Sequence, residues 1–163
     1  METIEAIEAL KRALPAAHFA LRGSPEYEEL LDNNFYQSGL LSDIAPACIV
    51  QPTTAEEVST FVKIIKPFAL SAGGKAKVRF AIVGQGQQPA PGCSNIEDGI
   101  TLSLNQLKGI NVIEGKDNDI VVQVSAGEGW GRVYAKLDPI GRSFSGGRSY
   151  YRSGIGGLAL AGR

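Results

Sequence analysis

An apolar run that leads into a glycine-rich loop is the part of the sequence best suited to hold a ligand. Phe80–Val83 fits a buried strand, and Gly84 and Gly86 follow it directly. Glycine lets the backbone turn sharply and approach a ligand closely, so such a loop can present backbone N–H groups to a phosphate. The same pattern also occurs at plain turns, and Gln85 places a side chain between the two glycines.

Further blocks follow this loop in a fixed order. They are 95–104, 124–130, 146–148 and 154–158, and the upstream segment 46–58 fits a strand, a turn and a helix. In this order and at this spacing, the blocks resemble the FAD-binding domain of the berberine-bridge-enzyme-like FAD-linked oxidases. These are flavoproteins of the vanillyl-alcohol-oxidase type, with a PCMH-type FAD-binding domain. The resemblance covers the N-terminal half of that domain.

The resemblance implies FAD as the cofactor and assigns a set of positions that face it. Three glutamines of the loop could supply amide donors and acceptors to a ligand, or could belong to a solvated loop. The single tryptophan is a candidate for the core as well as for the cofactor cleft, and 148–152 gathers guanidinium and phenol groups. The implied cofactor-binding residues are Gly84, Gln85, Gly86, Gln87, Gln88, Trp130, Gly146, Gly147, Arg148, Gly154, Gly156 and Gly157.

Both covalent flavin anchors of the family are replaced in this chain. The family loop reads Arg-Gly-Gly-Gly-His-Ser, and its histidine bonds to the flavin ring; here Val83, Gln85, Gln87 and Gln88 stand at the arginine, middle glycine, histidine and serine. Many members attach the flavin a second time through a cysteine, where Tyr150 stands here. We therefore expect FAD to be bound non-covalently or not at all, with Gln87 and Tyr150 as the candidate catalytic residues.

The local patterns predict elements along the first half of the chain. Apolar spacing predicts a short helix at the amino terminus, which ends before Pro15, and a further helical turn at 26–31. A buried strand is expected at 47–50. Thr53 or Thr54 should cap the next helix, which we expect to end at Pro67. The strand at 80–83 then completes a parallel βαβ unit.

After the glycine loop the pattern changes to short β-rich runs. These are 100–104, 110–113 and 120–124, and the last two read as a hairpin. A short helix is expected at 129–137, and the glycine-rich remainder reads as loop.

The predicted fold class is therefore α+β, a small parallel βαβ layer followed by an antiparallel sheet. We expect one truncated domain over 1–163, with a helical segment at 1–45, the βαβ unit and glycine loop at 46–92, and the antiparallel sheet and glycine-rich end at 93–163.

Composition excludes several classes of function. Sixteen basic and seventeen acidic residues give a net charge of −1, so we expect no nucleic-acid or membrane partner. His18 is the single histidine, and we predict neither a metal site nor triad chemistry. The acidic amino terminus lacks the pattern of a secretory signal. We also expect the two cysteines, Cys48 and Cys93, to be reduced. Both observations favour a cytoplasmic protein.

Two functions remain open from the sequence. The first is a FAD-linked oxidoreductase-like domain without covalent flavin, acting on a small organic substrate such as a secondary metabolite. The alternative is a cofactor-independent small-molecule binding protein, or a cyclase or isomerase derived from the flavin domain. We expect a homodimer, because half of a flavin domain leaves a sheet edge and an apolar face to cover. In the second case the pocket would form in this homodimer.

Overall fold

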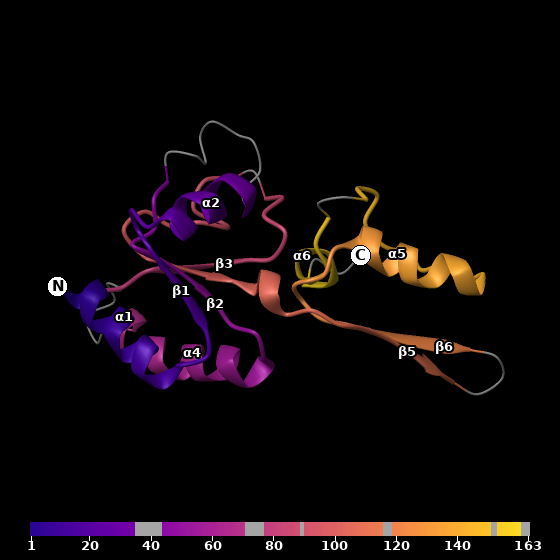
Figure 1. Cartoon of the computed structure of the whole chain (residues 1–163), viewed down its shortest axis with the longest axis horizontal. Helices are drawn as coiled ribbons and strands as arrows, with labels where there is room; N and C mark the ends of the chain where they lie inside the picture. Colours follow the sequence, from indigo (N-terminus) through magenta and orange to yellow (C-terminus); the bar gives the residue numbers. More distant parts are fainter. Residues whose placement is uncertain (35–43, 71–76, 89, 116–118, 151–152, 161–163) are drawn as a thin grey trace.

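The chain folds into two lobes, seen side by side in Figure 1. The computed structural model describes residues 1–34, 44–70, 77–88, 90–115, 119–150 and 153–160. We call 1–106 the sheet lobe, because it contains a four-stranded sheet with helices on both faces. We call 107–160 the hairpin lobe, because it contains a two-stranded hairpin and two α-helices.

The sheet lobe is built on a mixed sheet with the strand order β1-β2-β4-β3. Strands β2, β4 and β3 are parallel, and β1 joins the edge antiparallel to β2. The strands are β1 (His18–Leu21), β2 (Cys48–Gln51), β3 (Phe80–Val83) and β4 (Ile100–Ser103). The parallel order places the carboxyl ends of β3 and β4 at one edge of the sheet, where ligands commonly bind in open α/β sheets.

Successive side chains of a strand point to opposite faces of the sheet, and each face is covered by different helices. Cys48 and Val50 of β2 belong to the main core with α1 (Glu2–Ala13) and α4 (Ala55–Ala69). Ile49, between them, points to the other face and packs with Tyr27 of α2 (Pro25–Asn34). The sheet is therefore covered by helices on both faces, as parallel strands require.

Helix α4 begins as its sequence predicts but extends further. The Thr54 side chain accepts a hydrogen bond from the Glu57 backbone N–H at 3.2 Å, and Glu57 Oε2 accepts from the Thr53 N–H at 2.6 Å. The arrangement resembles a capping box, except that the carboxylate accepts from the residue before the cap. The expected end at Pro67 is wrong, because the helix continues to Ala69. A proline this close to the carboxyl end removes only its own N–H bond, and the Leu70 N–H still donates to the Lys66 carbonyl.

The hairpin lobe packs one face of a β-ribbon against a helix. Val112 of β5 (Ile110–Glu114) lies opposite Val122 of β6 (Ile120–Val124), and both pack with residues of α5 (Trp130–Leu137). The short helix α6 (Ile155–Leu160) adds Ile155 and Leu158 to this cluster.

The predicted fold class is confirmed, with three corrections to individual elements. The run at 100–104 does not belong with the antiparallel strands, because β4 is the central parallel strand and both Ile100 and Leu102 are fully buried. The segment 1–45 is not wholly helical, because β1 forms an edge strand. The glycine-rich end is not all loop, because α6 is held by the Ile155 N–H, which donates to the Glu128 carbonyl.

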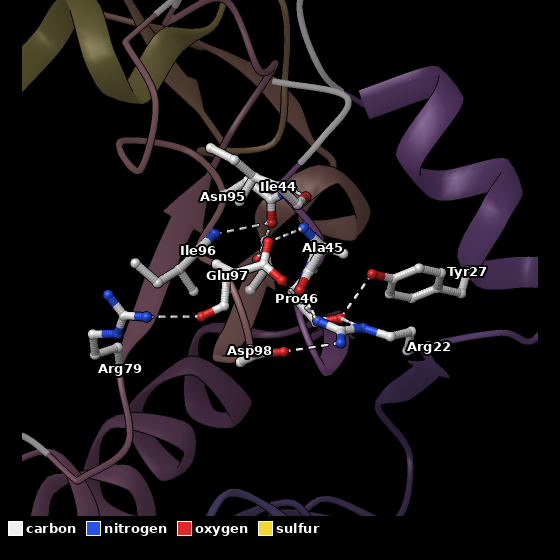
Figure 2. A network of polar contacts seen from close by, with 11 residues as sticks. Arg22, Tyr27, Ile44, Ala45, Pro46, Arg79, Asn95, Ile96, Glu97 and Asp98 are labelled. Atoms are coloured by element: carbon white, nitrogen blue, oxygen red, sulfur yellow. Dashed lines mark hydrogen bonds and ion pairs between the residues drawn. The ribbon is translucent and has the colours of Figure 1, made fainter. Parts of the chain in front are cut away.

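A polar network fixes the other edge of the sheet, away from the carboxyl ends of β3 and β4. Figure 2 shows this network, in which the Arg22 guanidinium donates to Asp98 Oδ1 at 2.9 Å and to the carbonyls of Ala45 and Pro46. Tyr27 Oη donates to the Pro46 carbonyl at 2.7 Å, and burial raises the pKa of its phenol. These bonds tie the start of β2 to the turn before β4.

Candidate functional site

Two adjoining cavities lie at the carboxyl edge of the parallel strands, and we call them together the cleft. The first has a volume of about 710 Å³ and the second about 760 Å³, and both are lined by Gln87, Ser153 and Leu158. The first cavity is otherwise lined by Ser145, Gly146, Gly147, Arg148 and Ser149. The second is otherwise lined by Ile82, Val83, Gly84, Gln85, Gly86, Gln88, Cys93, Ser94, Leu104, Ala126, Gly154, Gly156, Gly157 and Leu160.

The glycine loop forms the sheet-lobe wall of the second cavity, as its position after β3 predicts. Gly86 has a φ of 68°, a conformation that favours glycine. A Cβ on Gly84 would meet only the Ala126 carbonyl, at 3.8 Å. The backbone at Gly84 is therefore open to close approach by a ligand, whereas Gly86 is buried in the turn.

Gln85 does not direct its amide to a ligand. Its Nε2 donates to the Gly127 carbonyl at 2.9 Å and lies 3.5 Å from Asn105 Oδ1. In the described part of the chain, Asp98 is the only non-glycine residue with a positive φ, so Gln85 keeps an ordinary backbone. The side chain at this position is thus accommodated by turning it inward to the protein.

The other two glutamines line the cleft. Gln87 lies where the two cavities meet, and its Nε2 donates to Ser149 Oγ at 3.3 Å in an exposed contact. Gln88 is exposed on the wall of the second cavity, and its backbone carbonyl accepts from Ser94 Oγ at 3.4 Å. Both side chains offer donors and acceptors to a neutral or anionic ligand.

Trp130 lies in the core of the hairpin lobe, and neither cavity has it among its lining residues. It is 6% exposed and stacks between Tyr134 and Phe144, with ring centroids 6.0 and 5.9 Å away. A Cβ on Gly146 or Gly147 would overlap its ring. These two glycines therefore serve packing against the indole, although they also line the first cavity.

The last glycine block supplies the opposite wall of the second cavity. Gly154 pairs with Gly129 in an isolated β-bridge, which brings α6 to the cleft. A Cβ on Gly156 or Gly157 would meet no atom within 4 Å. Side chains at these two positions would therefore meet open space, and both residues line the second cavity.

The remaining predicted residues lie toward the rim. Arg148 is exposed and lines the first cavity. Tyr150 is half exposed, and its carbonyl accepts from the Gly131 N–H at 3.1 Å, but its side chain is not among those lining either cavity. Tyr151 and Arg152 lie outside the described residues.

Two features of the cleft have no clear signal in the sequence. Cys93 places an exposed thiol on the wall of the second cavity, whereas the buried Cys48 thiol has its pKa raised to about 12 by burial. Ile82 is 49% exposed and, with Leu158 and Leu160, gives the same cavity an apolar wall. Only the folded arrangement of β3 and α6 brings these side chains together.

A buried carboxylate, that of Glu128, holds the turn between β6 and α5. Glu128 is 1% exposed, and its Oε1 accepts from the Gly109 N–H at 2.9 Å, while Arg132 Nε lies 3.2 Å from Oε2 as an ion pair. Lys108 Nζ donates to the Gly127 carbonyl at 2.6 Å. Burial lowers the pKa of Lys108, and the nearby Glu128 carboxylate opposes that shift.

Comparison with known sequences assigns the chain to a family. The profile of a family described as FAD binding domain matches residues 46–163, and the chain belongs to this family. The FAD-dependent monooxygenase tpcD of Cochliobolus heterostrophus is 32% identical over 117 residues, which are 72% of this chain and 20% of tpcD. The FAD-dependent monooxygenase macF of Penicillium terrestre is 33% identical over 138 residues, 84% of this chain and 24% of macF. The chain thus spans a fifth to a quarter of these relatives.

Solved structures show the same fold. BBE-like 1 of Physcomitrella patens has a TM-score of 0.67 at 19% identity, over 93% of this chain and 29% of that protein. Phl p 4, a grass pollen allergen with glucose dehydrogenase activity, has a TM-score of 0.70 at 17% identity, over 94% and 30%. Glucooligosaccharide oxidase from Acremonium strictum, which carries a 6-S-cysteinyl, 8α-N1-histidyl FAD, has a TM-score of 0.65 at 22% identity, over 91% and 29%. The expected likeness to PCMH-type flavoproteins is confirmed.

Among the described residues, no helix is long and apolar enough to cross a bilayer. The same residues include no group of three or more His, Cys, Asp or Glu side chains that could hold a metal ion.

Proposed function

We propose that the chain is the part of a flavoprotein oxidoreductase that holds FAD non-covalently in the cleft. The observation that carries the proposal is the pair of open glycine walls. Gly84 and Gly86 line the second cavity from the sheet lobe, and Gly156 and Gly157 line it from the hairpin lobe. A Cβ would find room at Gly84, Gly156 and Gly157. A dinucleotide needs such close backbone approach along its phosphates.

The chemistry of the lining residues fits this cofactor. Backbone N–H groups and the amides of Gln87 and Gln88 can bond phosphate and ring oxygens. Ile82, Leu158 and Leu160 offer apolar surface, which suits a large aromatic ring. Bound FAD would supply the two-electron oxidation, and the protein would bind and orient it.

Non-covalent attachment is supported by the residues at the two anchor positions. Neither the amide of Gln87 nor the phenol of Tyr150 is the histidine or cysteine that the family uses. Gln87 is placed to contact a ligand from both cavities. The Tyr150 phenol, at the exposed rim, would act as an acid or a hydrogen-bond donor to the substrate.

The relatives support a small organic substrate of secondary metabolism. The sequence relatives named above are FAD-dependent monooxygenases. A structural neighbour, CrmK, is a flavoenzyme involved in caerulomycin biosynthesis, with a TM-score of 0.64 at 19% identity over 88% of this chain and 26% of CrmK. The free thiols of Cys48 and Cys93 support a reducing compartment such as the cytoplasm.

The proposal is tested by titrating the purified chain with FAD. We expect saturable binding with one FAD per chain, detected by quenching of flavin and Trp130 fluorescence, and a flavin absorbance band that stays with the protein on gel filtration. Titration that shows no saturable binding would contradict the proposal.

A second candidate function is cofactor-free binding of a small molecule, with cyclase or isomerase chemistry in a homodimer. It is favoured by Gln85, whose side chain fills a position that is glycine in the family loop and narrows the space beside Gly154. Such a protein would hold a substrate in a reactive conformation without redox chemistry. A colourless protein that does not respond to FAD, yet binds apolar ring compounds in the same cleft, would favour this candidate.

A further inference from the structure

Among the described residues, two side-chain hydrogen bonds cross the cleft from the sheet lobe to the hairpin lobe. Gln85 Nε2 lies 2.9 Å from the Gly127 carbonyl oxygen, and Gln87 Nε2 lies 3.3 Å from Ser149 Oγ. The Gln85 bond is partly buried and of ideal length, whereas the Gln87 bond is exposed and long. Water competes less for a buried bond, so Gln85 makes the stronger link between the lobes.

The Gln85 side chain is enclosed by three separate segments. Its amide also faces Asn105 Oδ1, at 3.5 Å, where the chain passes from one lobe to the other. A Cβ on Gly154 would lie 3.2 Å from the Gln85 Cβ and Cγ, and one on Gly129 would lie 3.9 Å from its amide carbon. Glycine at 154 therefore leaves room for this side chain, whereas a Cβ at 129 would make only an ordinary contact with it.

The acceptor of the Gln85 bond is itself held firmly. The Gly127 carbonyl also accepts from Lys108 Nζ at 2.6 Å, and the Gly127 N–H donates to the Leu107 carbonyl at 3.1 Å. A Cβ on Gly127 would overlap the Leu104 carbonyl, which shows how closely this turn packs against the sheet lobe. A bond to Gly127 thus fixes the base of the hairpin lobe.

We propose that Gln85 is a positioning residue that joins the two lobes and sets the width of the cleft before any ligand binds. The glycine of the family loop has no side chain that could make this link. When the cleft already has the shape that it takes in the complex, less free energy is lost in ordering it as the ligand binds. The link should therefore raise the affinity for the ligand. The effect on FAD rests on the function proposed above, whereas the link between the lobes does not.

The chain carries its own pair of probes for the distance between the lobes. Trp130 is the single tryptophan and lies in the hairpin lobe. Cys93 is exposed in the sheet lobe, and the other cysteine, Cys48, is buried. A fluorescent acceptor attached to Cys93 therefore reports energy transfer from Trp130, and time-resolved decay gives the distribution of distances between the lobes.

The variant Gln85→Met keeps the length of the side chain and removes its donors. The control Gln106→Met makes the same change at an exposed position of the sheet lobe. Without ligand, we expect Gln85→Met to broaden the distance distribution and the control to leave it unchanged. On unlabelled protein, we expect Gln85→Met to weaken FAD binding about tenfold, with no change for the control.

A Gln85→Met distribution identical to that of the parent would overturn the proposal. If the parent does not bind FAD, the proposed function fails, but the distance distribution still decides the role of Gln85. If Gln85→Met does not fold, Gln85→Asn takes its place, because its amide is one methylene shorter and cannot reach the Gly127 carbonyl. An unchanged distribution in that variant would overturn the proposal equally.

Discussion

Replacing Gly157 by alanine should separate binding in the cleft from stability of the fold. Gly157 lies in α6 on the wall of the second cavity, and a Cβ there would meet no atom within 4 Å. Alanine is favoured over glycine within a helix by about 0.5–1 kcal/mol, so the free energy of unfolding should stay level or rise. The new methyl group occupies cleft space, and we expect the Kd for FAD to rise about tenfold, or about 1.4 kcal/mol.

The matched variant Gly146→Ala should behave in the opposite way. Gly146 also lines the cleft, but a Cβ there would overlap the Trp130 ring. Overpacking of this kind costs about 1–3 kcal/mol, so the free energy of unfolding should fall.

Urea unfolding, monitored by Trp130 fluorescence, gives the free energy of unfolding of each variant. Titration of the folded protein with FAD gives its Kd. If Gly157→Ala binds FAD as tightly as the parent, the glycine wall is not the cofactor site. If Gly146→Ala unfolds at the same urea concentration as the parent, the assignment of Gly146 to packing is wrong.

Three further predictions concern attachment, the loop and assembly. Acid precipitation of flavin-loaded protein should leave a colourless pellet, because Gln87 replaces the histidine; a yellow pellet that persists in the Cys93→Ser control would contradict this. Gln87→Ala should weaken FAD binding tenfold or more, about 1.4 kcal/mol, with a nearly unchanged Tm, because its bond to Ser149 is exposed; full retention of binding would contradict its role. Light scattering should give twice the monomer mass, and Val121→Lys should halve it, because Val121 is 59% exposed on the outer face of the hairpin; a monomeric parent would contradict the dimer.

The elements with strong local signals could be predicted from the sequence. Helix α4 has side-chain caps from Thr54 and Glu57, and the hairpin β5–β6 has alternating apolar residues around a polar loop. In both cases the information lies within a few residues of the element. The glycine blocks likewise indicated the cleft, because the backbone freedom of glycine is a local property.

The strand pairing could not be predicted, because it depends on contacts distant in sequence. Four residues of β1 carry little periodicity, and only pairing with β2 makes them a strand. The sequence at 100–104 is compatible with either sheet. Ile100 and Leu102 are buried in the core with residues of α1 and α4, and this burial favours the parallel sheet.

Side-chain directions in the loop were also beyond the sequence. The partner of the Gln85 amide is 42 residues away, and nothing local indicates that the amide turns inward. Val83, which aligns with the family arginine, is buried at the end of β3. Val83 also lines the second cavity, and nothing in the sequence shows that this residue is both buried and at the cleft.

The central claim is that FAD occupies the cleft, and protection of Cys93 from alkylation tests it most directly. Cys93 is exposed on the wall of the second cavity. Cys48 is an internal control, because burial raises its pKa to about 12 and keeps it unreactive. We predict that FAD slows alkylation of Cys93 at least tenfold, with a concentration dependence that matches the Kd from titration. Alkylation of Cys93 at the same rate with and without saturating FAD would contradict the account.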